Sequence, residues 1–177
     1  MALETALGDL HHHLHGLRDA LLALRTTIVE DKPLEDDVVL VDVFRDAADD
    51  RLGLLDEALA AFQASGADPA AARRTIMICQ RQFNGIAQRF GADMVSYERI
   101  AALTRFGRRR GGEWHAWTRS VKQGLESCQE PLFDTNQAVF RCWQELTEYA
   151  APTLALRATI TEQAREQPVA LNERTDW

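Results

Sequence analysis

The fold is decided by residues 3–28, which read LETALGDLHHHLHGLRDALLALRTTI. Large aliphatic side chains recur in this stretch at alternating intervals of four and three residues. This spacing keeps them on one face of an α-helix and is typical of helices that pack side by side along a continuous seam. We therefore predict a first helix from about Leu3 to Glu30, which ends before Pro33 because the residue before a proline disfavours helical geometry. The seam consists of Leu3, Leu7, Leu10, Leu14, Leu17, Leu21, Leu24 and Ile28.

Two more amphipathic stretches follow. The second helix is predicted to begin within residues 34–37 and to stop at Ser65-Gly66, with an acidic first turn that suits the positive end of the helix dipole. Asp68 can cap the third helix, and Pro69 fits its first position because no amide donor is needed there. The third apolar stripe then continues to Phe106.

A fourth stripe runs from Trp114 to Tyr149 and is interrupted by Pro131. Because a proline cannot donate a helical hydrogen bond, we predict a kink or a short break between Glu130 and Asp134. After Pro152 the pattern fades. The chain is thus divided into a helical domain at residues 1–150 and a C-terminal tail at residues 151–177, with room for a short helix at residues 154–165.

These stripes predict an all-α protein, an antiparallel up-down-up-down four-helix bundle with coiled-coil-like packing, because short loops join neighbours that reverse direction. The first two helices are about 28 to 30 residues long and the last two about 38, which corresponds to roughly 45 Å and 57 Å. The hairpin of the third and fourth helices should therefore project beyond the hairpin of the first two.

The projecting end should carry opposite charges side by side. Residues 30–57 contain eleven acidic and three basic residues, whereas residues 73–122 contain eleven basic and three acidic residues. An up-down-up-down bundle brings the loop after the first helix and the loop after the third helix to the same end. We predict that this end binds a partner protein, together with Trp177 in the tail. The residues concerned are Asp31, Glu35, Asp36, Asp37, Arg105, Arg108, Arg109 and Arg110.

Composition indicates a cytoplasmic protein without a disulfide framework. The 177 residues are 46% hydrophobic and 27% charged, which suits one well-buried core. The three cysteines show no CxxC spacing and fall on the apolar stripes, so we predict small buried side chains and no nucleophile. No run approaches the ~18 apolar residues that a membrane span needs.

The histidines of the first helix give a metal-binding alternative. His11 and His15 lie one turn apart on the predicted helix, and Asp19 follows one turn later. Such a set resembles part of a metal site, although further ligands would have to come from other helices. No Glu-x-x-His motif occurs, since Glu113 lies only two residues before His115. We therefore predict no metal or other cofactor.

A second alternative concerns His12 alone. The run His12-His13-Leu14-His15-Gly16 resembles the signature around the phosphoryl-accepting histidine of histidine phosphotransfer domains: a histidine, any residue, an apolar residue, a basic residue and a glycine. The resemblance covers five residues. It departs from the pattern at the basic position, where this chain has His15 in place of the lysine of the signature. It implies an exposed phosphoacceptor on a helical bundle. The helical period places His12 opposite the leucine seam, between Gly8 and Gly16.

Residues 105–119 offer arginines beside aromatic side chains, an arrangement that can bind a nucleic acid. However, Trp114 and Trp117 fall on the apolar stripe, and cations at a helix C-terminus are favoured by the helix dipole itself. With no coherent catalytic set, the sequence favours a non-enzymatic bundle that binds other proteins as an adaptor, regulator or assembly subunit. A heptad seam leaves open whether some of its partner helices come from a second copy.

Overall fold

The computed structural model describes residues 2–30, 38–63, 69–106 and 112–166, and within these the side chains of residues 2–30, 41–62, 69–90, 92 and 112–149. The described residues are almost entirely helical and include no strand, which confirms the all-α prediction. The helices are α1 (Ala2–Glu30), α2 (Val38–Gln63), α3 (Pro69–Phe106), α4 (Gly112–Ser127) and α5 (Gln129–Glu166).

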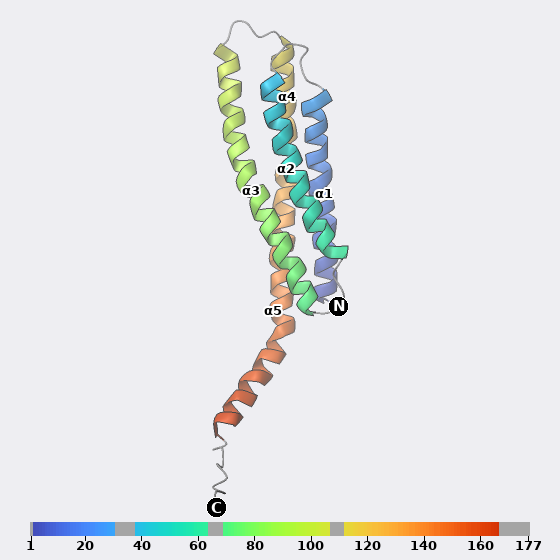
Figure 1. The fold of residues 1–177 in the computed structure, drawn as a ribbon, viewed down its shortest axis with the longest axis vertical. Helices are drawn as coiled ribbons and strands as arrows, with labels where there is room; N and C mark the ends of the chain where they lie inside the picture. The colour runs from blue at the N-terminus through green and yellow to red at the C-terminus, as the bar shows by residue number, and fades with distance from the viewer. Residues whose placement is uncertain (1, 31–37, 64–68, 107–111, 167–177) are drawn as a thin grey trace, which may run out of the picture.

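The helices form the predicted antiparallel bundle, in which α4 and α5 together make the fourth helix (Figure 1). On one side α1 packs against α2, and on the other it packs against α4 and α5. The fourth side is closed by α3, which contacts α2, α4 and α5. At the end where α3 finishes and α4 begins, both extend beyond α1 and α2, as their lengths predicted (Figure 1).

The leucine seam of α1 forms one wall of the core. Seven side chains of α1 are buried, and from Leu10 to Leu21 the seam leucines are 0% exposed. Leu3 and Leu7 lie in the first two turns of α1 and are only partly buried. Removing such side chains from water is the main force that holds amphipathic helices together. The buried residues of α1 are Ala6, Leu10, Leu14, Leu17, Leu21, Leu24 and Ile28.

Ion pairs on the surface fix the antiparallel register of α1 and α2. Arg18 contacts Asp56 at 2.8 Å, and one heptad further along α1, Arg25 contacts Asp49. Moving seven residues up α1 corresponds to moving seven residues down α2, as expected for a coiled-coil-like antiparallel pair. These exposed pairs contribute little stability, but they disfavour a shifted alignment.

The break in the fourth helix lies at Cys128, before the predicted position between Glu130 and Asp134. Pro131 stands at the third position of α5 and has no N–H to donate to the carbonyl four residues earlier, that of Ser127. The chain turns instead, with the Cys128 N–H donating to the Leu125 carbonyl at 3.2 Å. The proline therefore breaks the helix at the turn before it, and Pro131 itself lies in the first turn of α5.

The C-terminal part of α5 leaves the bundle. The helix continues through Pro152 to Glu166, where the sequence pattern had predicted a tail with a short helix, and it changes direction after leaving the bundle (Figure 1). Tyr149, predicted as the last core residue of the stripe, is 59% exposed. The core ends one turn earlier, at Leu146, near the first turns of α1, where the Cys142 thiol contacts the Ala6 carbonyl.

Candidate functional site

The charge-divided end predicted to bind a partner falls outside what the structure describes. Its acidic and basic loops belong to residues 31–37 and 107–111, and the side chain of Arg105 is likewise not described. The two loops do start from the same end of the bundle, because α1 and α3 end there and α2 and α4 begin there (Figure 1). The predicted residues outside the described side chains are Asp31, Glu35, Asp36, Asp37, Arg105, Arg108, Arg109, Arg110 and Trp177.

His12 stands on the solvent face of α1, as the helical period predicted. Its neighbours His11 and His13 are half-buried on the two flanks of the seam, so one turn of helix presents three imidazoles in three directions. The rings of His12 and His13 have centroids 5.6 Å apart. On the same face, one turn below and one turn above His12, are the two glycines of α1.

These glycines lack a packing reason. A Cβ atom added at Gly8 or Gly16 would meet nothing within 4 Å, and no described glycine has a positive φ that only glycine adopts readily. A glycine inside a helix costs about 0.5 to 1 kcal/mol relative to alanine. Two such residues therefore destabilise α1 while leaving the His12 imidazole clear of side chains on either side along the helix.

The metal-binding alternative finds little support in the arrangement of its residues. The rings of His11 and His15 meet edge to face with centroids 4.6 Å apart, and His11 also contacts Phe62 at 4.9 Å. Burial, and then the neighbouring His15, lower the pKa of His11. Within the described part of the chain, however, no three histidine, cysteine or carboxylate side chains, Asp19 included, lie close enough together to hold a metal ion.

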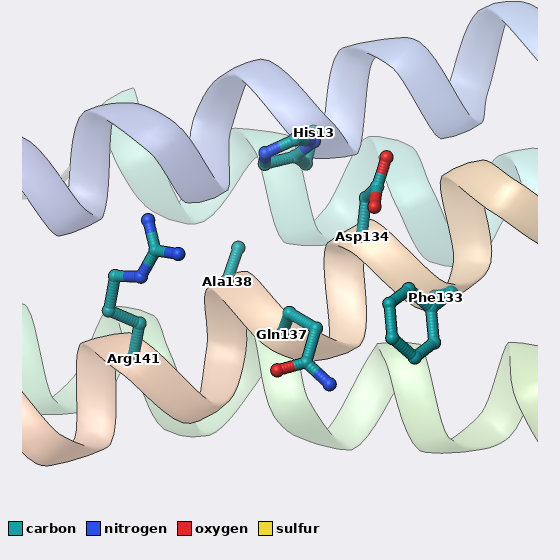
Figure 2. A pocket seen from close by; sticks show the side chains of 6 residues that line it. All are labelled: His13, Phe133, Asp134, Gln137, Ala138 and Arg141. Atoms are coloured by element: carbon teal, nitrogen blue, oxygen red, sulfur yellow. The ribbon is translucent and has the colours of Figure 1, made fainter.

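A surface hollow lies between α1 and α5, next to the His12 turn. It has a volume of about 420 Å³. Its wall on α1 is His13, and Figure 2 shows Asp134, Ala138 and Arg141 pointing from α5 toward that side chain. The two helices approach closely here because the buried Thr135 hydroxyl lies 3.3 Å from the His13 carbonyl and 2.7 Å from that of Pro131.

One charged pair closes an edge of this hollow. The Arg141 guanidinium lies 3.4 Å from the Asp9 carboxylate of α1, and both side chains remain substantially exposed, at 60% and 45%. The remaining lining side chains come from the outward part of α5. They are Phe133 and Gln137 (Figure 2). The hollow thus combines an aromatic ring with groups that donate and accept hydrogen bonds.

The cysteines are confirmed as core residues. All three thiols are 0% exposed, and burial raises the pKa of Cys79 and Cys142 to about 12 and that of Cys128 to about 11. The Cys142 thiol donates to the Ala6 carbonyl at 3.2 Å, which further favours its neutral form. Neutral buried thiols are poor nucleophiles and poor metal ligands.

The two tryptophans of the arginine-aromatic segment also belong to the core. Trp114 and Trp117 are 1% and 2% exposed and pack edge to face, with centroids 5.2 Å apart. The Trp117 indole N–H donates to the Ile28 carbonyl at 3.3 Å, in the last turn of α1, where carbonyls lack partners within the helix. A nucleobase cannot stack on two indole rings that are buried in the core, which weakens the nucleic-acid alternative.

Sequence reasoning missed three features of the surface and core. Arg51 is 3% exposed, and burial, together with the nearby Arg89, lowers its pKa. On α5, Phe133 and Phe140 are 62% and 60% exposed. The signal for these rings was present in the sequence: two phenylalanines lie one heptad apart, off the stripe that was assigned to the core.

No protein-family model, curated protein or solved structure matches this chain. Among the helices that the structure describes, none is both long enough and apolar enough to cross a membrane.

Proposed function

We propose that this chain is a non-enzymatic helical bundle of the cytoplasm that works by binding another protein, as an adaptor, regulator or assembly subunit. The observation that supports this proposal is the projection of α5 beyond the bundle (Figure 1). An isolated helix is marginally stable in water, because most helical stability in proteins comes from packing of an apolar face. A helix that continues beyond the other described helices is well suited to pack against a partner.

The boundary of the projection can be read from side-chain exposure. Cys142 is 0% and Leu146 is 8% exposed, whereas Tyr149, which follows on the same stripe, is 59% exposed. An aromatic ring with a hydroxyl group is a frequent anchor in protein interfaces, since it buries a large area and still makes a hydrogen bond. We infer that Tyr149 opens the partner surface at the point where α5 leaves the bundle.

The charge-divided end completes the proposal at the opposite end of the bundle. Acidic and basic loops that leave neighbouring helix ends would attract an oppositely patterned partner and fix its orientation, and they would speed association more than they raise affinity. The residues assigned to this role are Asp31, Glu35, Asp36, Asp37, Arg105, Arg108, Arg109 and Arg110, with Trp177 as an aromatic contact of the tail.

The test is affinity purification from the native organism with the wild-type chain and two matched variants. Tyr149→Asp places a charge on the proposed face, whereas Met77→Asp places the same charge on α3, where the native side chain is 52% exposed. Both positions are solvent-accessible, so both variants should keep the circular dichroism spectrum of the wild type. We expect a protein captured by the wild type and the Met77 variant to be lost from the Tyr149 variant.

A second variant addresses the charged end. Reversing Arg108, Arg109 and Arg110 together should reduce capture of the same protein and make the remaining binding less sensitive to salt. Equal capture by every variant would rule out both surfaces as the place where a partner binds.

A histidine phosphotransfer bundle that uses His12 is the second candidate function. The specific observation that favours it is the exposure of His12 between two glycines, which place no side chain one turn before or after it on the same face of α1. A phosphoryl group can be passed between proteins only if the accepting nitrogen is accessible to in-line attack. In such a transfer, an imidazole nitrogen would bond to phosphorus as the donor aspartate oxygen leaves.

This candidate is tested with phosphorylated receiver domains and detection of acid-labile phosphohistidine. His12→Gln should abolish labelling, whereas His115→Gln, at an exposed position of α4, should not change it. Replacing both glycines by alanine should stabilise α1 and leave the labelling unchanged, since the added methyl groups meet nothing within 4 Å. A folded wild-type chain that takes up no label, or an undiminished label in His12→Gln, excludes the site.

A further inference from the structure

The outward face of α5 carries a second seam, on the side of the helix opposite the core. Its members are spaced by three and four residues, like those of the inner seam, and every one of them is exposed. A helix that joins one core needs a single apolar stripe, so the core of the described helices does not account for an additional aromatic-containing stripe. We define the outer seam as Glu130, Phe133, Gln137, Phe140, Gln144 and Thr147.

Two phenylalanines dominate the centre of the outer seam. Phe133 and Phe140 are 62% and 60% exposed, and seven residues of helix separate them by roughly 10 Å. Each ring leaves most of its apolar area in water, where its removal would be favourable. Exposed aromatic side chains at heptad spacing are the arrangement by which one helix receives another.

The charges beside the two rings differ in sign. Asp134 follows Phe133, and Arg141 follows Phe140. Each phenylalanine is therefore followed by a charged residue, which is acidic at the first ring and basic at the second ring one heptad later. Figure 2 shows both charged side chains on the α1 side of α5, where they line the same hollow. These residues lie symmetrically about position 137. Phe133 and Asp134 precede it by four and three residues, and Phe140 and Arg141 follow it by three and four residues.

We propose that this face binds the same face of a second copy of the chain, with the two α5 helices antiparallel and a two-fold axis near Gln137. In this arrangement Phe133 lies beside Phe140 of the second copy, and Asp134 lies beside Arg141 of the second copy. Both contacts occur twice because of the symmetry. A parallel pair would instead oppose like charges, so the charge pattern selects the antiparallel arrangement.

The residue at the axis also suits a symmetric contact. A glutamine amide carries both donors and an acceptor, so the Gln137 side chains of two copies can hydrogen-bond to each other. The rings and the charges set the register, because a shift of one heptad would again place Gln137 opposite a polar residue of the outer seam but would separate Phe133 from Phe140 of the second copy. The same device operates inside the bundle, where the pairs Arg18–Asp56 and Arg25–Asp49 set the antiparallel register of α1 and α2.

The size of the face predicts the strength of the dimer. Residues 130–147 span roughly 27 Å of helix, so the interface is small compared with the ~800 Å² per partner of a standard stable complex. The dimer should therefore be in rapid, concentration-dependent exchange with the monomer. The inference concerns the part of α5 within the bundle and holds whether or not the projecting part binds another protein.

Charge reversal combined with sedimentation analysis tests the proposal. Asp134→Arg leaves two bases on each copy and Arg141→Asp leaves two acids, so each variant alone should remain monomeric at concentrations where the wild type dimerises. Mixing the two variants places acids opposite bases at both contacts and should restore the dimer. The Arg141 variant also loses its exposed pair with Asp9, which contributes little to folding.

A cysteine at the axis gives an independent readout. In Gln137→Cys the two thiols of a dimer face each other, so mild oxidation should yield a covalent dimer rapidly. Arg81→Cys, at an exposed position of α3, is the matched control and should cross-link slowly. The native cysteines do not compete, since all three are 0% exposed.

Three results would overturn the proposal: a wild-type chain that sediments as a monomer at every concentration, charge variants that dimerise as well as the wild type, or equal cross-linking rates at positions 137 and 81. Failure of these tests leaves the partner-binding role of Tyr149 unaffected, because the lysate experiment reports on a different part of α5.

Discussion

Alkaline pH should destabilise this protein through its buried thiols. Burial raises the pKa of Cys79 and Cys142 to about 12 and of Cys128 to about 11, from an ordinary value of 9.0. Above pH 9 the unfolded chain therefore releases thiol protons that the folded chain retains, so rising pH favours unfolding. The stabilisation is fully present below pH 9 and is lost as pH rises toward the folded values.

The magnitude follows from the width of this window. Between about pH 8 and pH 10 each thiol contributes a loss of about 1.4 kcal/mol, because its unfolded-state pKa is passed and its folded-state pKa is not. Three thiols together remove about 4 kcal/mol, a large share of the 5 to 15 kcal/mol by which domains are typically stable. Few other groups compete in this range, since the chain has two lysines and two tyrosines.

Urea unfolding at a series of pH values measures this loss directly. A variant with all three cysteines replaced by alanine is the control: it starts less stable because of the cavities, but its stability should depend much less on pH between 8 and 10. If the free energy of unfolding fell equally steeply with pH in the two proteins, the thiols would not be the cause of the loss. Rapid reaction of the native thiols with a disulfide reagent near neutral pH would also refute this explanation, since buried thiols are inaccessible.

Two further predictions concern α1. Gly16→Ala should raise the free energy of unfolding by about 0.5 to 1 kcal/mol, because its new methyl group meets nothing within 4 Å. Gly124→Ala, on α4 against α1, should lower this free energy by about 1 kcal/mol, because its Cβ would lie 2.8 Å from Cδ1 of the buried Leu24. Parallel denaturant titrations compare the two variants, and the reverse order of stability would contradict the packing. His15→Gln should raise the pKa of His11 toward its ordinary value, since it removes a neighbouring positive charge and leaves burial unchanged. NMR titration of the imidazole checks this, and an unchanged pKa would show that the contact has no electrostatic effect.

The helices were predictable because each one repeats a single period. Pro69 and Phe106 bound α3 as the sequence indicated, and Glu30 ends α1 as indicated by the proline that follows. A stripe of 3.6-residue period indicates the buried face of a helix, and the three cysteines, Trp114 and Trp117 are therefore buried as predicted. Helix direction followed from the short loops.

The same period cannot state where a partner helix stops. Tyr149 shares the stripe of Leu146, but it lies one turn beyond the end of the core and is exposed. Nor does the pattern recognise a charged residue that lies on the inner face, which is why Arg51 was missed. Phe133 and Phe140 were missed for a related reason: once a stripe had been assigned to the core, apolar residues outside it had no predicted partner.

The break at Cys128 shows how local a proline effect can be. Along the fourth helix, Gly124 faces Leu24, Thr135 bonds to the His13 carbonyl, and the Cys142 thiol bonds to the Ala6 carbonyl. Each step forward along α4 and α5 thus equals the step backward along α1, on both sides of the break.

A true hinge would shift this correspondence by several residues or redirect one helix away from α1. Here the turn absorbs the missing hydrogen bond of Pro131 within a few residues, and both helices keep the same neighbour. The register argument extends to the outer seam, which starts at Glu130, directly after the turn. Since α5 is packed on its inner side from there to Leu146, its outer face presents a supported surface, which is the property that a symmetric helix pair requires.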